Sequence, residues 1–326
     1  MTKISLSEIS VPIDKELNEF VVLFRNSLKS KVGLLDIVTR FILKQKGKKI
    51  RPLLVLLASK ACGNVNERTY RGAILVELLH TATLVHDDVV DSAESRRGFP
   101  SINAIWKNKI AVLMGDYLLA KGLMLAVDSK DFDFLQVITN TVKRMSEGEL
   151  LQISKTRKLD NDEETYFRII SDKTASLLST CCSIGAMAST ENEEVVKALH
   201  DYGENIGLAF QIRDDLLDII GTKSLLGKPL GGDIKEKKLT LPLIHALRTA
   251  APAESKKIIS ELKRSEKKIN VSLIVDFILK YGGVDYAEKK AFEIIKKAKD
   301  NLAILPDSEA KRSLLLLSDY IIERKK

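Results

Sequence analysis

Apolar residues recur every three to four positions along most of this 326-residue chain. This spacing is the period of an amphipathic helix, and few segments alternate apolar and polar residues as strands do. The pattern predicts helices at residues 14–29, 34–44, 50–62, 66–91, 109–128, 131–157, 162–189, 192–219, 239–250, 254–263, 270–281, 283–304 and 308–324. Gly63, Gly282 and Pro306 mark helix ends, and Asp131 and Asp307 are predicted N-caps. The predicted fold class is therefore all-α.

No linker, low-complexity stretch or short-period repeat divides the sequence. We therefore predict one domain, residues 1–326, built as a single large helical bundle. Two stretches, residues 92–100 (SAESRRGFP) and 221–233 (GTKSLLGKPLGGD), are non-helical and basic and contain glycine. Segments of this kind commonly close over an active site, so both are predicted lids.

The strongest functional signal is an acidic pattern that occurs twice, each time on an apolar helix. Its members are Asp87, Asp88 and Asp91 in LVHDDVVD, and Asp214, Asp215 and Asp218 in FQIRDDLLD. Residues four apart share one helix face, where like charges repel unless a cation compensates them. Oxygen ligands without cysteine or clustered histidine favour Mg²⁺, which binds one or two carboxylates together with substrate phosphates. The two helices are predicted walls of a central cavity that holds one ligand between them.

Basic side chains that suit a phosphate ligand accompany both acidic helices. They are Lys48, Arg51, Arg96, Arg97, Lys173, Lys228 and Lys238, with Thr174 beside Lys173 and His80 on the helix of Asp87. Lys48 and Arg51 lie at a predicted helix start, where the helix dipole favours anions. Each residue alone has a plain structural explanation, such as a solvated helix end, a snorkelling lysine or a core histidine. All these explanations would have to hold together around two acidic helices, so we favour a phosphate site.

The net charge is +8, from 52 Lys and Arg against 44 Asp and Glu. Much of the excess lies in scattered runs, including residues 263–268 and the final Arg324, Lys325 and Lys326. No aromatic residues interleave with these charges, so solvated helix faces are favoured and no nucleic-acid partner is expected. Three cysteines lie in no disulfide or metal-ligand spacing, and we find no apolar signal core and no apolar run of about 18 residues. We therefore expect a soluble, cytoplasmic protein.

A series of sequence blocks, in order, resembles those of the trans-prenyl diphosphate synthases, also called polyprenyl synthetases. The blocks are GKKIRP (47–52), HTATLVHDDVVD (80–91), RRGFPS (96–101), MGDYLLA (114–120), GELLQ (148–152), DKTA (172–175), FQIRDDLLDI (210–219) and GKPLGGDIKEKKLTLP (227–242). The resemblance implies a prenyltransferase: an all-α bundle around a deep central cavity, a homodimer, and Mg²⁺-dependent elongation of an allylic diphosphate by isopentenyl diphosphate. The chain departs from the family at Lys46 and Lys237, where glycine is usual.

The resemblance also implies a role for each matched residue. Asp87, Asp91 and Asp214 would ligate Mg²⁺, about three ions once substrate is bound, and Asp88, Asp215 and Asp218 would orient the ligands. Arg96, Lys173, Lys228 and Lys238 would bind the allylic diphosphate, and Lys48, Arg51, His80 and Arg97 would bind isopentenyl diphosphate. Gln211, Thr174 and Gln152 would face the site. Lys235, Lys237 and Lys238 are alternatives for the last phosphate contact.

Product length is expected to depend on the residues that precede Asp87 on its helix. Thr83 lies one turn before Asp87 with Ala82 beside it, where short-chain relatives commonly carry bulky aromatics. The DDVVD spacing also lacks the two-residue insertion typical of bacterial short-chain enzymes. Both features favour a long product of about seven to ten isoprene units, near octaprenyl, with slow release and transient membrane contact.

Three alternatives stay open from the sequence. A short-chain synthase, for farnesyl or geranylgeranyl diphosphate, would result if Leu79, Met114, Met124 or Met145 closed the tunnel. A non-catalytic regulatory subunit would normally have lost aspartates or arginines that are present here. A class I terpene cyclase would normally carry Asn, Ser and Glu on the second helix, where this chain has aspartates.

Overall fold

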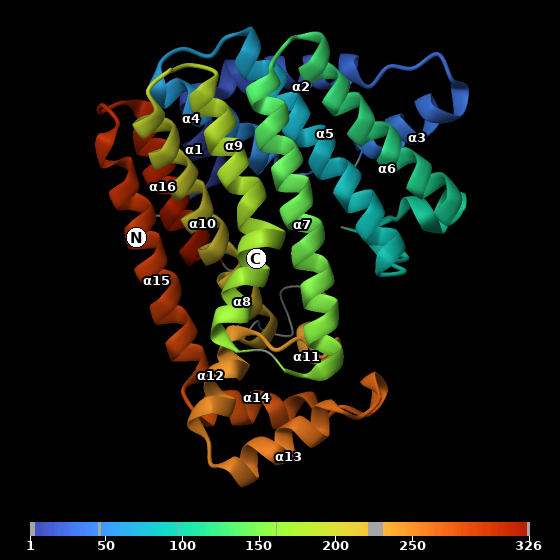
Figure 1. Cartoon of the computed structure of the whole chain (residues 1–326), viewed down its shortest axis with the longest axis vertical. Helices are drawn as coiled ribbons and strands as arrows, with labels where there is room; N and C mark the ends of the chain where they lie inside the picture. The colour runs from blue at the N-terminus through green and yellow to red at the C-terminus, as the bar shows by residue number, and fades with distance from the viewer. Residues whose placement is uncertain (1–3, 45–46, 97, 161, 221–230, 325–326) are drawn as a thin grey trace. The chain divides into compact units, whose positions relative to one another are not determined.

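The computed structural model describes residues 4–44, 47–96, 98–160, 162–220 and 231–324, except for the Arg96 side chain. In these ranges the regular structure is helical apart from one two-stranded hairpin, which confirms the predicted all-α class (Figure 1). The backbone divides into two compact units. The first unit comprises Met1–Asn140, Thr180–His200 and Ile304–Leu314, and the second comprises Thr141–Ser179, Asp201–Ala303 and Leu315–Lys326. A single domain stays a prediction.

The elements follow one another along the chain in two groups. The first group is α1 (Leu6–Ser10), η1 (Val11–Ile13), α2 (Asp14–Ser27), α3 (Gly33–Lys44), α4 (Ile50–Cys62), α5 (Glu67–Val90), β1 (Ser95–Arg96), β2 (Phe99–Pro100), α6 (Ile102–Asp128) and α7 (Phe132–Lys158). The second group is α8 (Glu163–Ile170), η2 (Ser171–Ala175), α9 (Ser176–Met187), α10 (Glu193–Ile220), α11 (Gly232–Lys235), α12 (Leu241–Thr249), α13 (Pro252–Leu262), η3 (Glu266–Lys268), α14 (Val271–Lys280), α15 (Gly283–Asn301), η4 (Leu302–Ile304) and α16 (Glu309–Glu323).

Most predicted helices occur close to their expected bounds, with two clear differences. Helix α6 contains a kink at Lys107 (φ 69, ψ 164): the helix predicted at 109–128 follows this kink, and a short helical stretch from Ile102, which was not predicted, precedes it. The helix predicted at 162–189 is divided by the π-helical turn η2 into α8 and α9. Helices α1 and α11 are too short for a periodic pattern and were not predicted.

In the first unit, α5 and α6 pack side by side (Figure 1). Glycines on α6 permit the close approach: a Cβ at Gly115 would lie 2.2 Å from His86 Nε2, and one at Gly122 would lie 3.2 Å from the Leu75 side chain. His86 Nε2 lies 3.3 Å from the carbonyl oxygen of Val112. The MGDYLLA block therefore holds α6 against the end of α5 that carries the first acidic pattern.

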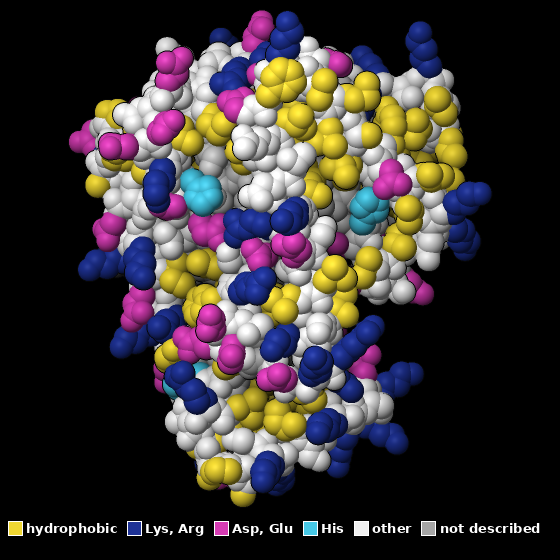
Figure 2. Space-filling model, viewed as in Figure 1, with side chains coloured by type: hydrophobic (Ala, Val, Ile, Leu, Met, Phe, Trp, Pro, Cys, Tyr) yellow, Lys and Arg dark blue, Asp and Glu magenta, His cyan; other side chains and the backbone are white. Residues whose placement is uncertain are grey.

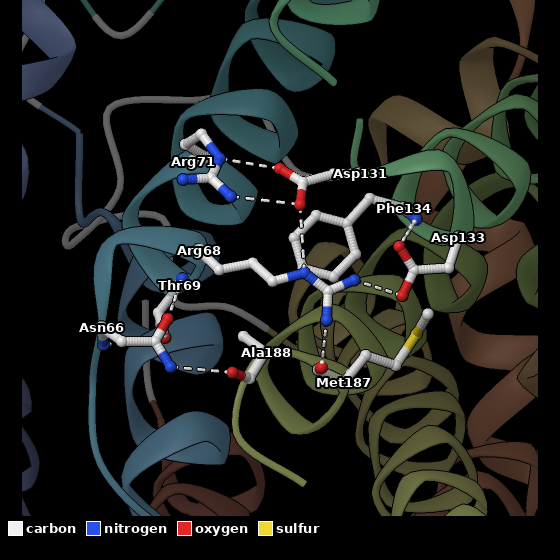
Figure 3. A network of polar contacts seen from close by, with 9 residues as sticks. All are labelled: Asn66, Arg68, Thr69, Arg71, Asp131, Asp133, Phe134, Met187 and Ala188. Carbon is white, nitrogen blue, oxygen red and sulfur yellow. Dashed lines mark hydrogen bonds and ion pairs between the residues drawn. The ribbon is translucent and has the colours of Figure 1, made fainter. Parts of the chain in front are cut away.

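A polar network fixes the N-terminal end of α5 (Figure 3). Asn66 Oδ1 accepts from the Thr69 N–H at 3.0 Å, and Thr69 Oγ1 accepts from the Asn66 N–H at 3.2 Å. This reciprocal capping box satisfies two backbone donors. Arg68 Nε and Arg71 Nε donate to Asp131 at 3.1 and 2.7 Å, so both guanidiniums of this turn neutralise one buried carboxylate.

The two predicted N-caps need correction. Asp131 precedes α7 as expected, but its carboxylate binds guanidiniums rather than the backbone of its own helix. Helix α16 is capped by Ser308, whose Oγ accepts from the Lys311 N–H at 3.1 Å, and not by Asp307. Asp307 instead pairs with the Lys311 ammonium at 3.0 Å.

The first predicted lid, residues 92–100, contains a small hairpin in the first unit. β1 pairs antiparallel with β2, and Gly98 supplies the positive φ of 80° at the turn. Ser101 fastens the base of the hairpin, since its N–H donates to Glu94 O at 3.1 Å and its Oγ to Ala93 O at 2.6 Å. Arg97 and most of the second predicted lid, residues 221–230, lie outside the described residues.

Among the described residues, helix α6 has the length and composition of a membrane span. Its most apolar window has a mean hydropathy of 1.8, and 33% of that window is buried. The expectation that no apolar run approaches this length was therefore wrong, because Asp116 and Lys121 interrupt the stretch only singly. The core helix of a soluble protein passes the same test, so the finding is weak evidence for a span.

In the second unit, α12, α14 and α15 pack together. The turn from α14 to α15 uses Gly282 at φ 68°, and a Cβ at Gly283 would lie 2.2 Å from Pro242 O. Figure 2 shows lysine and arginine side chains gathered over α13 and α14. The exposed lysines of this segment are Lys256, Lys257, Lys263, Lys267, Lys268 and Lys280. The exposure of residues 263–268 agrees with the predicted solvated helix face.

Candidate active site

The first acidic pattern occupies the C-terminal turn of α5. Asp88 is buried, with 5% of its surface exposed, Asp87 is half-buried, and Asp91 is the exposed C-cap residue. The Asp91 N–H donates to Asp87 O at 2.8 Å, and Asn103 Nδ2 on α6 donates to Asp88 O at 3.2 Å. Three carboxylates therefore share one helix end, as the sequence predicted.

Both acidic patterns lie at the electrostatically unfavourable end of their helices. The second pattern occupies the last two turns of α10, and neither α5 nor α10 has lysine or arginine in its last turn. The helix dipole is negative at this end, where it opposes a carboxylate by roughly 0.3–1 kcal/mol and favours a cation. Each of these helix ends is therefore suited to a bound cation.

Helix α4, in the first unit, begins without a side-chain cap. Its N-cap residue, Lys49, has a left-handed backbone (φ 50, ψ 35) and makes no capping hydrogen bond. Uncapped backbone N–H groups at the positive end of a helix favour an anion. Lys48 is exposed and Arg51 is half-buried beside this end. The predicted diphosphate residues therefore flank a helix start that suits phosphate.

The residues preceding Asp87 on α5 are packed closely. His80 is 9% exposed and Ala82 is 2% exposed. Thr83 Oγ1 donates to His80 O at 2.9 Å, so its hydroxyl is satisfied within the helix. Ala82 and Thr83 thus give this part of α5 two small side chains, and the Thr83 hydroxyl already has a hydrogen-bond acceptor.

In the second unit, Lys173 lies in the π-helical turn η2. Such turns are rare and occur frequently at functional sites. Glycines on the neighbouring helices accommodate the turn: a Cβ at Gly148 would lie 3.0 Å from Lys173 N, and one at Gly207 would lie 2.5 Å from Ala175 Cα. The glycine of the GELLQ block therefore allows α7 to approach the turn that carries Lys173.

Asp215 is the centre of a hydrogen-bonded chain. Tyr166 OH donates to Asp215 Oδ2 at 2.7 Å, and Gln211 Nε2 donates to Asp215 Oδ1 at 2.9 Å. Thr174 Oγ1 in turn donates to Gln211 Oε1 at 3.0 Å. The chain runs through three predicted site residues, Thr174, Gln211 and Asp215, and ends at Tyr166.

The charge on Asp215 is poorly compensated by these neutral donors. Burial raises the pKa of Asp215 to about 7, and the carboxylates of Asp233 and Asp214 act in the same direction. The hydrogen bonds from Tyr166 and Gln211 oppose this rise only in part. Burial, together with the Asp215 carboxylate, also raises the pKa of the Tyr166 phenol well above its usual value. Tyr166 is therefore a fixed hydrogen-bond donor.

The Asp218 side chain contacts the start of α11. Its two carboxylate oxygens accept from the Gly232 and Asp233 N–H groups at 3.1 and 3.0 Å, at the start of α11. Gly231 donates to the Asp218 backbone at 3.1 Å. The side chain predicted to orient metal ligands is thus engaged in holding residues 231–233 against α10.

Of the alternatives Lys235, Lys237 and Lys238, only Lys238 lines the pocket described below. Lys238 Nζ pairs with Glu236 Oε2 at 2.5 Å and lies 3.6 Å from Asp233 Oδ1. Lys237 has a positive φ of 61°. A left-handed backbone favours glycine. This preference explains why glycine is usual at this position in the family that the sequence resembles.

Several predicted residues meet in one pocket of the second unit, which has a volume of about 100 Å³. Its polar and charged lining comprises Gln152, Lys155, Thr156, Tyr166, Lys173, Thr174, Gln211, Asp215, Asp233, Lys238 and Thr240. Lys173 Nζ pairs with Glu149 at 2.5 Å and lies 3.4 Å from Gln152 Oε1.

Four residues that contact the predicted site residues were not predicted from the sequence: Tyr166, Glu149, Asp233 and Arg324. Arg324 Nη2 donates to Asp214 Oδ1 at 2.7 Å, and the Asp214 side chain is 44% exposed. The first unit carries predicted residues at the start of α4 and along α5. Arg96 lies in β1, Arg97 and Lys228 lie outside the described residues, and their predicted phosphate contacts stay predictions.

The donor chemistry of these residues fits Mg²⁺ completed by a substrate. Within the described ranges, no group of three or more His, Cys, Asp or Glu side chains is arranged as a metal site. Asp87, Asp91 and Asp214 are nevertheless hard oxygen donors that are at least partly exposed. Mg²⁺ usually binds through one or two carboxylates plus substrate phosphates and keeps several waters. Such a site needs no protein cluster of three ligands.

The polyprenyl synthetase family profile matches residues 33–277, which include both acidic patterns and parts of both units. The chain belongs to the polyprenyl synthetase family. This confirms the family and the prenyltransferase class that the sequence blocks indicated.

Named relatives in this family differ in product length. The chain is 36% identical over 282 residues to a short chain isoprenyl diphosphate synthase of Methanothermobacter thermautotrophicus, covering 85% of this chain and 86% of the relative. It is 32% identical over 320 residues to the octaprenyl diphosphate synthase of Haemophilus influenzae, covering 98% and 97%. It is 35% identical over 314 residues to heptaprenyl diphosphate synthase component 2 of Bacillus subtilis, covering 96% and 87%.

Solved structures of the family share the fold. A decaprenyl diphosphate synthase from Rhodobacter capsulatus superposes with a TM-score of 0.91 at 34% identity, covering 99% of this chain and 100% of that one. A polyprenyl synthase from Caulobacter crescentus, complexed with calcium and isoprenyl diphosphate, superposes with a TM-score of 0.90 at 31% identity and covers 100% of both chains.

Proposed function

We propose that this polyprenyl synthetase is a Mg²⁺-dependent enzyme that elongates an allylic diphosphate with isopentenyl diphosphate to a long product. The observation that carries the proposal is the pair of carboxylate clusters at the negative ends of α5 and α10, without lysine or arginine in either last turn. Such ends attract cations, and Mg²⁺ ions that bind together with a substrate diphosphate would suit both of them.

In this proposal Asp87, Asp91 and Asp214 hold about three Mg²⁺ ions on the allylic diphosphate. The calcium and isoprenyl diphosphate in the Caulobacter relative support a metal-bound diphosphate in this fold. Bound Mg²⁺ would stabilise the charge that develops on the departing diphosphate. Lys173 and Lys238 would bind the same diphosphate from the pocket of the second unit.

The other substrate would be bound by Lys48, Arg51 and His80. The uncapped start of α4 and its two cations would orient isopentenyl diphosphate so that its double bond faces the allylic carbon. Condensation forms a carbon–carbon bond and loses a proton, which the released diphosphate would accept. Burial of the reacting groups would exclude water from the allylic cation.

The activity is tested by incubating the purified protein with Mg²⁺, labelled isopentenyl diphosphate and geranyl, farnesyl or geranylgeranyl diphosphate. We expect a product ladder that ends near forty carbons, because the small Ala82 and Thr83 side chains would leave room for a long chain, each five-carbon unit of which gains roughly 4 kcal/mol by apolar burial. A stop at about fifteen or twenty carbons would contradict the long-chain part of the proposal. Absence of product from every primer would favour a regulatory subunit or a missing partner.

The long-chain assignment depends on the small residues Ala82 and Thr83 before Asp87. We expect Ala82→Phe and Thr83→Phe to shorten the main product, because each side chain adds bulk where the growing chain would pass. Thr81→Phe is the matched control, since residues 81 and 83 point to nearly opposite sides of α5. Unchanged product lengths in both variants would refute the role of this part of α5.

We further propose that two copies associate through α6. Leu113, Met124 and Val127 are 55%, 61% and 47% exposed, and their spacing puts them on one face of α6. Leu113→Lys with Met124→Lys is expected to convert a dimer into a monomer in light scattering, whereas Val22→Lys, at an equally exposed position on α2, is not. A monomeric wild type that dimerises only with another chain would favour a heteromer, the arrangement suggested by the "component 2" relative.

The free thiols Cys62, Cys181 and Cys182 favour a reducing compartment. We therefore propose a cytoplasmic enzyme with transient membrane contact during release of a long product. Product release accelerated by phospholipid vesicles, with no change for short products, would support this contact.

A further inference from the structure

The end of the described chain contacts the second acidic helix within the second unit. Arg324 follows α16 and is buried, with 8% of its surface exposed. Its Nη2 donates to Phe210 O at 2.8 Å and to Asp214 Oδ1 at 2.7 Å. The sequence had assigned this arginine to a solvated terminal run. The contact instead connects it to a carboxylate of the acidic pattern.

The contact is reciprocal between the two segments. Arg213 Nε and Nη2 both donate to the carbonyl oxygen of Arg324 at 3.2 Å. The Arg324 guanidinium also stacks on the Phe210 ring, 3.8 Å from its centroid. Arg213 thus binds the backbone of residue 324, while the Arg324 side chain binds α10. In this contact between the two segments, it is the Arg324 side chain that donates to Asp214.

The buried guanidinium of Arg324 is costly for a purely structural contact. Burial lowers the pKa of Arg324, and the Asp214 carboxylate opposes that change. Its Nε is buried without a hydrogen-bond partner among the described residues. An apolar side chain of similar volume would often pack such a position at no loss of stability. The charge therefore points to a role at Asp214.

We propose that Arg324 is a positioning residue that holds the Asp214 carboxylate in the orientation needed for metal binding. The inference rests on the proposed function, in which Asp214 is a metal ligand. Ligating carboxylates are commonly held by hydrogen bonds from outer residues, whose loss costs about 10- to 100-fold in metal affinity or activity. Arg324, fixed by Phe210 and by its own backbone, is built to supply such a bond.

The opposite effect is the main competing explanation. A guanidinium on Asp214 also adds positive charge near the metal, so its removal could tighten metal binding by relieving repulsion. The two explanations predict opposite changes in affinity. Arg213→Met removes an equal charge from the residue next to Asp214 and breaks the hydrogen bonds from Arg213 to the Arg324 carbonyl oxygen, so it serves as the matched control.

The test measures Mn²⁺ affinity of the full-length protein with inorganic pyrophosphate, by electron paramagnetic resonance. We expect Arg324→Met to weaken Mn²⁺ binding by about tenfold or more, and Arg324→Lys to recover part of the loss. Arg213→Met should lower the unfolding temperature without this loss. In activity assays, Arg324→Met should raise the Mg²⁺ concentration for half-maximal rate while the KM for isopentenyl diphosphate stays constant.

Equal Mn²⁺ affinity in Arg324→Met and Arg213→Met, or tighter binding in Arg324→Met, would overturn the inference. If Arg324→Met does not fold, Arg324→Gln takes its place, because the shorter neutral side chain does not restore the charged contact; unchanged affinity in Arg324→Gln with Asp214→Asn weakened would overturn the inference equally. Asp214→Asn separates this inference from the proposed function. If that variant binds Mn²⁺ as the wild type does, the metal assignment of Asp214 fails, and the inference fails with it.

Discussion

Asp131 in the first unit and Asp215 in the second have the same exposed fraction, each with 4% of its surface exposed. Burial raises the pKa of either carboxyl group, but Arg71 and Arg68 reverse the effect at Asp131 and hold its pKa below the usual value. Asp215 receives hydrogen bonds from neutral groups and the field of other carboxylates, and its pKa rises to about 7. The same exposed fraction thus accompanies opposite electrostatic outcomes, because the neighbouring charges differ and because Asp215 lies deeper within its unit.

The difference separates a structural acid from an acid of the candidate site. At Asp131 the fold itself supplies the counter-charges, and the network in Figure 3 joins the start of α5 to that of α7. At Asp215 the fold supplies geometry but leaves the charge poorly compensated. Strongly perturbed carboxyl groups in a pocket are typical of functional sites. We therefore expect substitutions at the two places to affect different properties.

The largest expected effect is a loss of catalysis on substitution of Asp214, the residue that precedes Asp215. Asp214→Asn should lower kcat/KM by about 10³-fold, because a neutral amide loses a metal ligand that stabilises the departing diphosphate. The amide oxygen can still accept from Arg324, so the unfolding temperature should change little. Steady-state kinetics with saturating Mg²⁺ measure the effect. A loss below about tenfold would remove Asp214 from the proposed ligand set.

Asp131→Asn should instead lower stability. We expect a loss of about 2–3 kcal/mol in the free energy of unfolding at pH 7, because the change leaves two guanidiniums without their shared carboxylate. The estimate is modest because the Arg68 and Arg71 side chains are 32% and 28% exposed. Urea unfolding measures the loss, and kcat per folded molecule should stay near that of the wild type.

The pH dependence of that loss has a definite sign. The folded pKa of Asp131 is depressed, so its ion pairs stabilise the protein above the unfolded pKa of about 3.9 and are lost as the pH falls through the folded pKa. The stability difference between the wild type and Asp131→Asn should therefore be full at pH 6 and shrink below about pH 4. A difference that grows in acid would contradict the assignment.

Asp215→Asn tests the other side of the comparison. It should reduce activity by about 10- to 100-fold, as expected for a residue that orients a ligand rather than binding substrate itself. Stability should change by less than about 1 kcal/mol, because relief of the buried charge offsets the altered hydrogen bonds with Tyr166 and Gln211. A large loss of stability with normal activity would make Asp215 a structural acid like Asp131.

Helix positions were predictable where the apolar period is long and unbroken. The bounds of α4 and α5 agree with the pattern within one residue, since both carry continuous core-facing positions. The π-helical turn at Lys173 was not predictable, because its residues fit an α-helical period and only packing against Gly148 and Gly207 favours the bulge. Local sequence thus predicts the helices better than their interruptions.

The aspartates of the candidate site were predictable from their spacing, whereas their partners were not. Tyr166 and Asp215 are 49 residues apart and Arg324 and Asp214 are 110 apart, so only tertiary packing brings each pair together. Asp218 also has partners that the spacing does not indicate, since backbone N–H groups at the start of α11 donate to its carboxylate; its role at the metal site stays a prediction. Spacing identifies acidic candidates, and packing decides what each one binds.

The smallest expected effect isolates one hydrogen bond to Asp215. Tyr166→Phe removes the phenol that donates to Asp215 Oδ2 at 2.7 Å and leaves the buried ring in place. Tyr286→Phe is the matched control, because Tyr286 OH donates to Glu163 Oε1 at the same distance outside the pocket lining. Each variant should lose about 1 kcal/mol of stability, and only Tyr166→Phe should also lower kcat, by about threefold to tenfold. Equal kcat values in the two variants would mean that the Tyr166 bond supports the fold, as the guanidiniums do at Asp131, and does not tune the acid of the site.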